Sequence, residues 1–194
     1  MNKAIILLIT TFMIGSLNAQ DKIQNINFLF ANKGFGIGYE FESFIRTDRS
    51  IGLDLKLYDI RNDEFAVYNP YSNQINIAGE KDILIVPIFF KSNFYLSNNR
   101  IENKIKPYFT FAIGPFIAID ADENISSFSE KWTSTKSQTN LGTSLGFGLN
   151  FYLISGNNIS VGIGYDYFNV DRPIHSIENF GGGSLFFKYQ IGRE

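Results

Sequence analysis

Apolar residues alternate with small or polar residues along most of this chain, and this period of two constrains the fold more than any other feature. Between Ser50 and Tyr58, every second residue is Ile or Leu, whereas Gly, Asp and Lys occupy the positions between them. The same alternation continues from Leu141 to Leu153. Successive side chains of a strand point to opposite faces, so this pattern predicts strands with two different environments. The expected fold class is therefore all-β.

Eight segments carry the pattern, and we expect each of them to form one strand. They are Gln24–Asn32, Phe35–Ile45, Ser50–Ile60, Asp82–Leu96, Ile105–Ile119, Asn140–Ile154, Ile159–Val170 and Gly183–Gly192.

The connections between these segments alternate in length. Short connections with turn residues lie at Arg46–Arg49, Ser97–Lys104 and Ser155–Asn158, and long polar ones lie at Arg61–Lys81, Asp120–Thr139 and Asp171–Gly182. The first connection, near Lys33, is also short. An even number of strands with short turns at one end and longer loops at the other is typical of outer-membrane barrels, whose short turns are periplasmic.

The two faces of these strands differ in a way that indicates which one points inward. One face carries bulky apolar residues, and the other collects glycines among charged residues, namely Gly36, Gly38, Gly52, Gly114, Gly142, Gly146, Gly148, Gly162, Gly164 and Gly192. Glycine weakens a strand, so a water-exposed surface has no reason to collect it. The interior of an eight-stranded barrel does, because it is only just wide enough for side chains. The bulky face therefore points outward, where it needs lipid.

The inward face also carries four acids and four lysines, which we expect to form a lumenal charge network. They are Glu40, Glu42, Asp54, Asp166, Lys56, Lys91, Lys106 and Lys188. Unpaired buried charge is costly, so ion pairs and hydrogen bonds should join these side chains. We interpret the network as a structural plug, because eight strands leave no aqueous channel.

Composition excludes several other classes of protein. The 194 residues suffice for one domain with a core of its own. The chain has no Cys and one His, which excludes disulfides, cysteine-type zinc sites and multi-histidine metal sites. A net charge of -2 with no basic cluster argues against nucleic-acid binding. We expect no cofactor, no metal and no catalytic residue.

The first nineteen residues read as a secretory signal peptide. Lys3 supplies a positive start, Ala4–Leu17 is a short apolar run, and Ala19 offers a small residue for cleavage. The apolar run is too short to span a membrane as a helix. We therefore divide the chain into a cleaved signal peptide at 1–19 and one barrel domain at 20–194.

Several motifs resemble a known family. Ile85-Val86-Pro87-Ile88-Phe89-Phe90-Lys91 is followed by the strand Lys106–Pro115 with its Pro-Tyr start, and Gly-x-Gly alternations occur at 146–148 and 162–164. These features resemble the outer-membrane protein beta-barrel domain family, the small OmpA/OmpX-like barrels. The resemblance covers nearly all of the chain after residue 19, and it transfers no catalytic residue.

Two finer expectations follow from the barrel hypothesis. Pro87 and Pro115 stand within strands of a closed barrel and lack a ladder donor, so we expect β-bulges there. Aromatic residues should form girdles at the two membrane interfaces. Candidates for one girdle are Phe41, Phe44, Phe94, Tyr95, Tyr108, Phe109, Phe151, Tyr152 and Tyr189, and candidates for the other are Tyr58, Tyr165, Tyr167 and Phe168.

Two other functions and one metal site are alternatives to this interpretation. A secreted, lipocalin-like barrel that binds a small apolar ligand would also alternate, although the glycine-rich face and the lone Trp132 in a loop argue against it. A lipid A hydrolase would combine His175 and Glu178 with a serine, either Ser176 or one at 126, 127 or 129. Adjacent side chains of a strand point in opposite directions, which argues against Ser176. The segment from Asp120 begins like a calcium loop, but Ile125 and Lys131 stand where such a loop has Gly and Glu.

The sequence thus predicts an eight-stranded antiparallel up-and-down transmembrane β-barrel in the outer membrane of a Gram-negative bacterium. We expect a monomer with a structural or surface-interaction role through its outer loops. Its expected partners are outer-membrane lipid, the barrel-assembly machinery and an unknown extracellular partner.

Overall fold

Eleven strands make up most of the part of the chain that the structure describes. The structure is a computed structural model, and it describes residues 21–32, 34–61, 65–69, 74–78, 82–96, 105–120, 136–154, 156–174 and 177–193. The strands are β1 (Asp21–Ala31), β2 (Gly34–Arg46), β3 (Arg49–Arg61), β4 (Phe65–Asn69), β5 (Gln74–Ala78), β6 (Asp82–Tyr95), β7 (Ile105–Asp120), β8 (Lys136–Tyr152), β9 (Asn158–Ile174), β10 (Ile177–Asn179) and β11 (Gly182–Arg193). No helix in these ranges is long and apolar enough to cross a membrane. The predicted signal peptide at 1–19 lies outside them.

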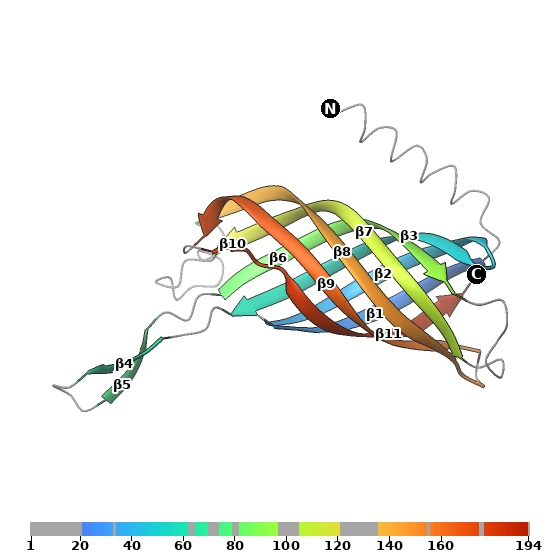
Figure 1. The fold of residues 1–194 in the computed structure, drawn as a ribbon, viewed down its shortest axis with the longest axis horizontal. Helices are drawn as coiled ribbons and strands as arrows, with labels where there is room; N and C mark the ends of the chain where they lie inside the picture. The colour runs from blue at the N-terminus through green and yellow to red at the C-terminus, as the bar shows by residue number, and fades with distance from the viewer. Residues whose placement is uncertain are drawn as a thin grey trace.

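Eight of these strands form a closed antiparallel barrel, as the sequence predicts (Figure 1). The sheet runs β9-β11-β1-β2-β3-β6-β7-β8, and a further pairing of β8 with β9 closes it. The first and last barrel strands pair with each other, from Ile23 opposite Arg193 to Ala31 opposite Ser184. Each strand pairs with its neighbour along the chain, which defines an up-and-down topology.

The eight predicted segments match the eight barrel strands, with ends that differ by a few residues. Three further strands lie where the sequence suggests only long polar connections. β4 and β5 form a separate two-stranded hairpin between β3 and β6, and the short β10 pairs with the far end of β9. The description of Arg61–Lys81 and Asp171–Gly182 as plain connections is therefore incomplete.

The two ends of the barrel differ, and we name them by their connections. The turn end carries the β2–β3, β6–β7 and β8–β9 connections, and the loop end carries the β1–β2, β3–β6, β7–β8 and β9–β11 connections. At the turn end, the amide of Gly156, at φ +88°, donates to the carbonyl of Leu153 at 3.0 Å and tightens the β8–β9 turn. The hairpin of β4 and β5 extends beyond the loop end (Figure 1).

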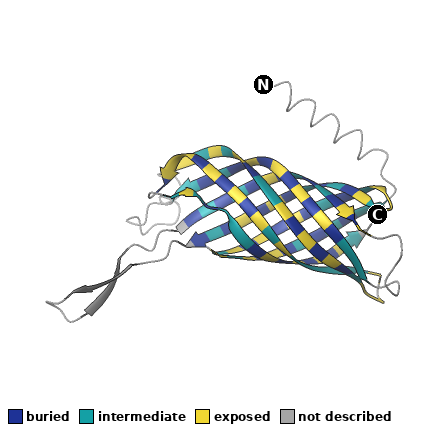
Figure 2. Cartoon of the chain, in the orientation of Figure 1, coloured by how far each residue is buried: buried dark blue, intermediate teal, exposed yellow. Residues whose placement is uncertain are grey.

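Burial alternates along every barrel strand and produces the chequered pattern of Figure 2. Bulky apolar residues predicted to face outward do so, among them Ile37, Leu55, Phe109, Phe111, Leu145, Phe147, Leu185 and Phe187. Each of these side chains remains substantially exposed although it is apolar. The glycines at 36, 38, 52, 114, 142, 146 and 148 are buried inside. The outward apolar belt and the inward glycine face thus agree with the predicted orientation.

The prolines do not create the predicted β-bulges. Pro87 stands opposite Phe116, and the β6–β7 register is the same on both sides of the unpaired positions 88–89 and 114–115. The β3–β6 register likewise continues unchanged past the unpaired positions 86 and 87. The ladder therefore omits pairs beside the prolines without inserting a residue, and the expectation of bulges was wrong.

Candidate functional site

The barrel interior is the candidate site, because it gathers most of the charged side chains that the sequence singled out. Seven of the eight predicted lumenal residues are almost fully buried inside the barrel, namely Glu40, Glu42, Asp54, Asp166, Lys56, Lys91 and Lys188. They come from β2, β3, β6, β9 and β11, because alternate positions of each strand face inward.

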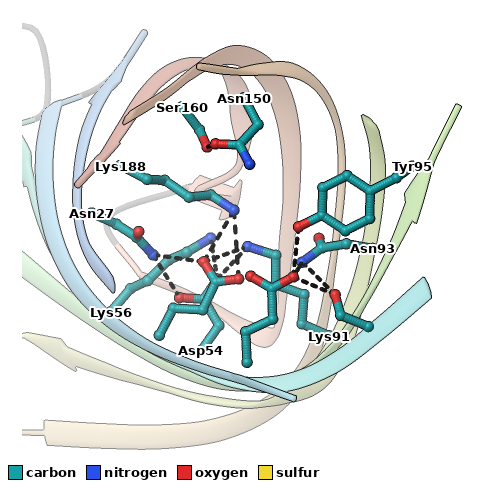
Figure 3. A network of polar contacts seen from close by, with 12 residues as sticks. Asn27, Asp54, Lys56, Lys91, Asn93, Tyr95, Asn150, Ser160 and Lys188 are labelled. Carbon is teal, nitrogen blue, oxygen red and sulfur yellow. Dashed lines mark hydrogen bonds and ion pairs between the residues drawn. The ribbon is translucent and has the colours of Figure 1, made fainter. Parts of the chain in front are cut away.

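Glu40 is the centre of the buried charge cluster, and its two lysine partners, Lys91 and Lys188, are labelled in Figure 3. Its carboxylate lies 2.9 Å from the ammonium of Lys91 and 3.0 Å from that of Lys188. The side-chain amide of Asn27 donates to the same carboxylate at 3.3 Å. One carboxylate thereby connects β1, β2, β6 and β11 across the lumen.

Asp54 is the second carboxylate of this cluster. The ammonium of Lys56 lies 3.1 Å from it and that of Lys91 lies 3.7 Å from it, and Asn27 donates a hydrogen bond to it at 3.2 Å. Lys91 and Asn27 therefore each interact with both Asp54 and Glu40. Because charges withdrawn from water are tolerated when paired and hydrogen-bonded, this sharing explains how the cluster can be buried.

Glu42 lies nearer the turn end and is held mainly by neutral donors. The hydroxyl of Ser50 donates to its carboxylate, as do the amide of Asn93 at 3.0 Å and the phenol of Tyr95 at 2.7 Å. Three donors on one carboxylate satisfy the charged form without a direct ion pair.

Two predicted network members lie to either side of the central cluster. Asp166 accepts a hydrogen bond from the phenol of Tyr58 at 2.9 Å. Lys106, at the start of β7, is only partly buried, and its ammonium donates to the backbone carbonyl of Thr47 at 2.7 Å. It also lies 4.8 Å from the ring centre of Tyr95. The structure therefore places Lys106 at the turn end, away from the Glu40–Asp54 cluster.

A second cluster, made of aromatic rings, fills the lumen on the loop-end side. Tyr58, Phe89, Phe116 and Phe168 are each at most 2% exposed, and the ring of Phe168 lies 5.5, 5.9 and 5.2 Å from those of Tyr58, Phe89 and Phe116. We call these four residues the ring cluster. Aromatic pairs at such distances stabilise a core beyond the area they bury.

The ring cluster corrects the predicted aromatic girdles. Tyr58 and Phe168 were assigned to one girdle and Tyr95 and Tyr108 to the other, yet all four are buried inside the barrel. Phe94, Phe109, Tyr152, Tyr189, Tyr165 and Tyr167 do face outward. The alternation along the strands could have indicated this, because Tyr58 lies on the same strand face as the inward Lys56, and Phe168 on the same face as the inward Asp166.

The inward glycines make room for the inward rings. A Cβ placed at Gly142 would lie 3.0 Å from Phe89, Phe116 and Phe168, and one at Gly148 would lie 2.8 Å from the ring of Tyr108. A Cβ at Gly162 would overlap the ring of Phe186. Glycine is thus placed where a large ring from another strand reaches the barrel wall.

Several candidate residues fall where the structure gives no description. The structure does not describe His175, Ser176, Trp132 or the serines at 126, 127 and 129, nor the segment after Asp120 that begins like a calcium loop. Glu178 lies in β10. Within the described ranges, no group of three or more His, Cys, Asp or Glu side chains is arranged to hold a metal ion.

Comparisons with known proteins identify the architecture. No family model matches the chain, and no curated protein matches it. Among solved structures, Neisserial surface protein A has a TM-score of 0.57 at 14% identity, over 88% of this chain and 94% of that one. The N-terminal β-barrel domain of Pseudomonas aeruginosa OprF has a TM-score of 0.51 at 9% identity, over 89% of this chain and 98% of that one. Ail of Yersinia pestis gives 0.43 at 12% identity, over 88% and 95%. At these identities the likeness to the first two structures shows the fold alone, which is that of small outer-membrane barrels.

Proposed function

We propose that this protein is an outer-membrane barrel of a Gram-negative bacterium, with a closed lumen and a structural or surface-interaction role carried by its loop end. The observation that carries the proposal is the belt of exposed apolar side chains around a barrel whose interior is charged and filled. A soluble protein rarely exposes so continuous an apolar surface, whereas a bilayer requires one. Outer-membrane lipid is therefore the first partner that we propose.

The orientation that we propose follows from the connections. Short turns at the periplasmic side and longer loops outside are the rule for such barrels. The turn end would then be periplasmic, and the loop end with β4, β5 and β10 would be extracellular. Export would use the signal peptide at 1–19, insertion would use the barrel-assembly machinery, and the barrel would act as a monomer. An unidentified extracellular partner would bind at the loop end.

A closed lumen is supported by the way its interior is filled. The Glu40–Asp54 cluster and the ring cluster occupy successive levels of the barrel interior. Eight strands enclose space for side chains and leave no aqueous channel. The role we propose therefore involves neither catalysis nor a steady ion current.

The lipocalin-like alternative needs an apolar cavity of about 300 Å³ or more for its ligand. The cavity beside Asp54 and Lys188 has only about 20 Å³ open to the centres of water molecules, and charged and hydroxyl side chains form much of its lining. This interior supports the membrane barrel over the ligand-binding barrel.

The test is cell fractionation, followed by gel electrophoresis of each fraction with and without boiling. We expect the protein in the outer-membrane fraction, in a band whose mobility changes on boiling because the closed barrel resists detergent. A soluble protein with an unshifted band would contradict the proposal and would direct the search to a ligand in the lumen.

A further inference from the structure

A small cavity lies at the centre of the lumen, between the Glu40–Asp54 cluster and the opposite barrel wall, and both apolar and polar side chains line it. Asn27, Asp54, Lys91 and Lys188 line it from β1, β3, β6 and β11, and Thr110 lines it from β7. Of its volume, about 20 Å³ is open to the centres of water molecules. One water needs about 10–15 Å³ by this measure, so the cavity has room for one or two waters.

Two buried polar atoms of the lining find no hydrogen-bond partner among the described residues. They are the side-chain oxygen Oδ1 of Asn27, in a residue 2% exposed, and the hydroxyl Oγ1 of Thr110, in a residue 6% exposed. The oxygen Oδ2 of Asp54 lies within ion-pair distance of Lys56 and Lys91 but accepts no well-directed hydrogen bond in the described part of the chain. More than nine in ten buried polar groups are hydrogen-bonded, so the unpartnered oxygens of Asn27 and Thr110 beside one cavity indicate an occupant that bonds to them.

The charges around the cavity favour a neutral occupant. Lys56, Lys91 and Lys188 contribute three positive charges to the lining, and Asp54 and Asp166 contribute two negative charges. The third negative charge belongs to Glu40, which pairs with Lys91 and Lys188. Glu42 is also buried, but it does not line the cavity, and Ser50, Asn93 and Tyr95 donate hydrogen bonds to its carboxylate. The six charges at the cavity balance, so a cation or an anion placed there would add an uncompensated charge.

We propose that this cavity is a built water site, in which one or two ordered waters bridge Thr110 to Asn27 and Asp54. Water donates to the oxygens of Asn27 and Asp54 and accepts from the hydroxyl of Thr110, so it complements all three atoms. β7 and β1 lie four strands apart in the eight-stranded barrel and therefore face each other across the lumen. The waters thus connect the charge cluster to the opposite wall of the barrel, where the hydroxyl of Thr110 on β7 has no partner among the described side chains.

The site predicts the sign of a mutational effect. If Thr110 bonds to water, then Thr110→Val removes one partner of a buried water, and the urea midpoint of unfolding of the folded barrel in detergent should fall. If the hydroxyl has no partner, removing it relieves a buried unsatisfied group, and the midpoint should stay or rise. Thr110→Ser, which keeps the hydroxyl and loses a methyl group, is the matched control for packing.

A direct measurement keeps the proposal testable if the variant does not fold. In a high-resolution crystal structure of the unaltered barrel, we expect solvent density within hydrogen-bond distance of both Asn27 Oδ1 and Thr110 Oγ1. Absence of that density in an ordered lumen, or a stabilised Thr110→Val variant, would overturn the proposal. None of these readouts requires a membrane location, so the water site and the proposed function can fail separately.

Discussion

Charged residues inside this barrel differ from those on its surface in their access to water, and Glu40 illustrates the difference. It pairs with two lysines that are themselves almost fully buried. By contrast, the ion pair of Arg46 with Asp48 lies on the surface, at 3.9 Å and with well-exposed side chains. Water screens the surface pair, whereas the lumen offers Lys91 and Lys188 few other anions.

We predict that Glu40→Gln destabilises the folded barrel by about 3–5 kcal/mol, because it leaves two buried ammonium groups short of a counter-charge. Urea unfolding of the barrel in detergent measures the change. Asp48→Asn is the matched control, because it removes an exposed carboxylate next to Arg46 and Arg49 and should cost less than about 1 kcal/mol. Equal effects of the two substitutions would contradict this account of the lumen.

A second residue-scale prediction concerns the glycines that face rings. Gly162→Ala should cost about 1–3 kcal/mol, because its Cβ would overlap the ring of Phe186 and the carbonyl of Phe147. Gly183→Ala is the control, since a Cβ there lies 3.7 Å from its nearest neighbour, the side chain of Asn32. The measurement is the temperature at which each variant unfolds, read from the loss of the fast or slow folded band on gels of samples heated to increasing temperatures. A Gly183→Ala variant as unstable as Gly162→Ala would show that contact with the ring does not decide the cost, because the lower entropy of the unfolded alanine chain favours folding at both positions.

The sequence predicts which residues enter the lumen better than it predicts what they do there. Parity places Glu40, Asp54 and Lys188 inside, because a strand side chain has only two directions. It cannot show that Lys91 lies between two carboxylates, since that depends on the stagger of non-adjacent strands. The ring cluster was missed because aromatic residues are expected at membrane interfaces, and that expectation outweighed the parity of Tyr58 and Phe168.

At the scale of elements, the barrel strands and the outer strands obey different constraints. Each barrel strand is paired on both sides, whereas β4 and β5 pair only with each other in the described part of the chain. The barrel strands were predictable because their alternation reflects two contrasting environments. The hairpin and β10 were not, because they lie within stretches that read as polar loops. The β-bulges expected at Pro87 and Pro115 are absent for another reason. The ladder of strand pairs omits pairs beside the prolines without a shift in register.

We predict that the β4–β5 hairpin is dispensable for barrel formation. Replacing residues 62–81 by a short turn should leave the boiling-dependent gel shift intact, because this hairpin forms a sheet separate from the barrel. Deleting residues 182–193 is the contrasting variant, because it removes β11, which pairs with both β9 and β1. Loss of the gel shift on removal of the hairpin alone would show that the hairpin helps to form the barrel.

At the scale of the whole molecule, the asymmetry between the turn end and the loop end determines the proposed orientation. Because the chain has no Cys, single cysteines can report it without background. We predict that Glu178→Cys, at the loop end, reacts in intact cells with a maleimide that does not cross the outer membrane. Ile154→Cys, at a fully exposed position of the β8–β9 turn, should react only after the cells are broken.

The opposite labelling pattern would reverse the proposed orientation while leaving the barrel unchanged. Labelling of both positions in intact cells would contradict a transmembrane location. Reaction of both variants after disruption is the internal control, since it shows that each thiol is accessible to the reagent.

The pairing of β1 with β11 has a consequence for the order of events during folding. Ile23 and Arg193 are partners although about 170 residues separate them, and β11 follows every other strand along the chain. Closing so long a loop costs only about 2.5 kcal/mol more entropy than closing a ten-residue hairpin, because the cost grows with the logarithm of length. Time is the larger constraint, since the edge of β1 that faces β11 has no partner until β11 has been synthesised and has reached it. The barrel can therefore close only after all eight of its strands have been made.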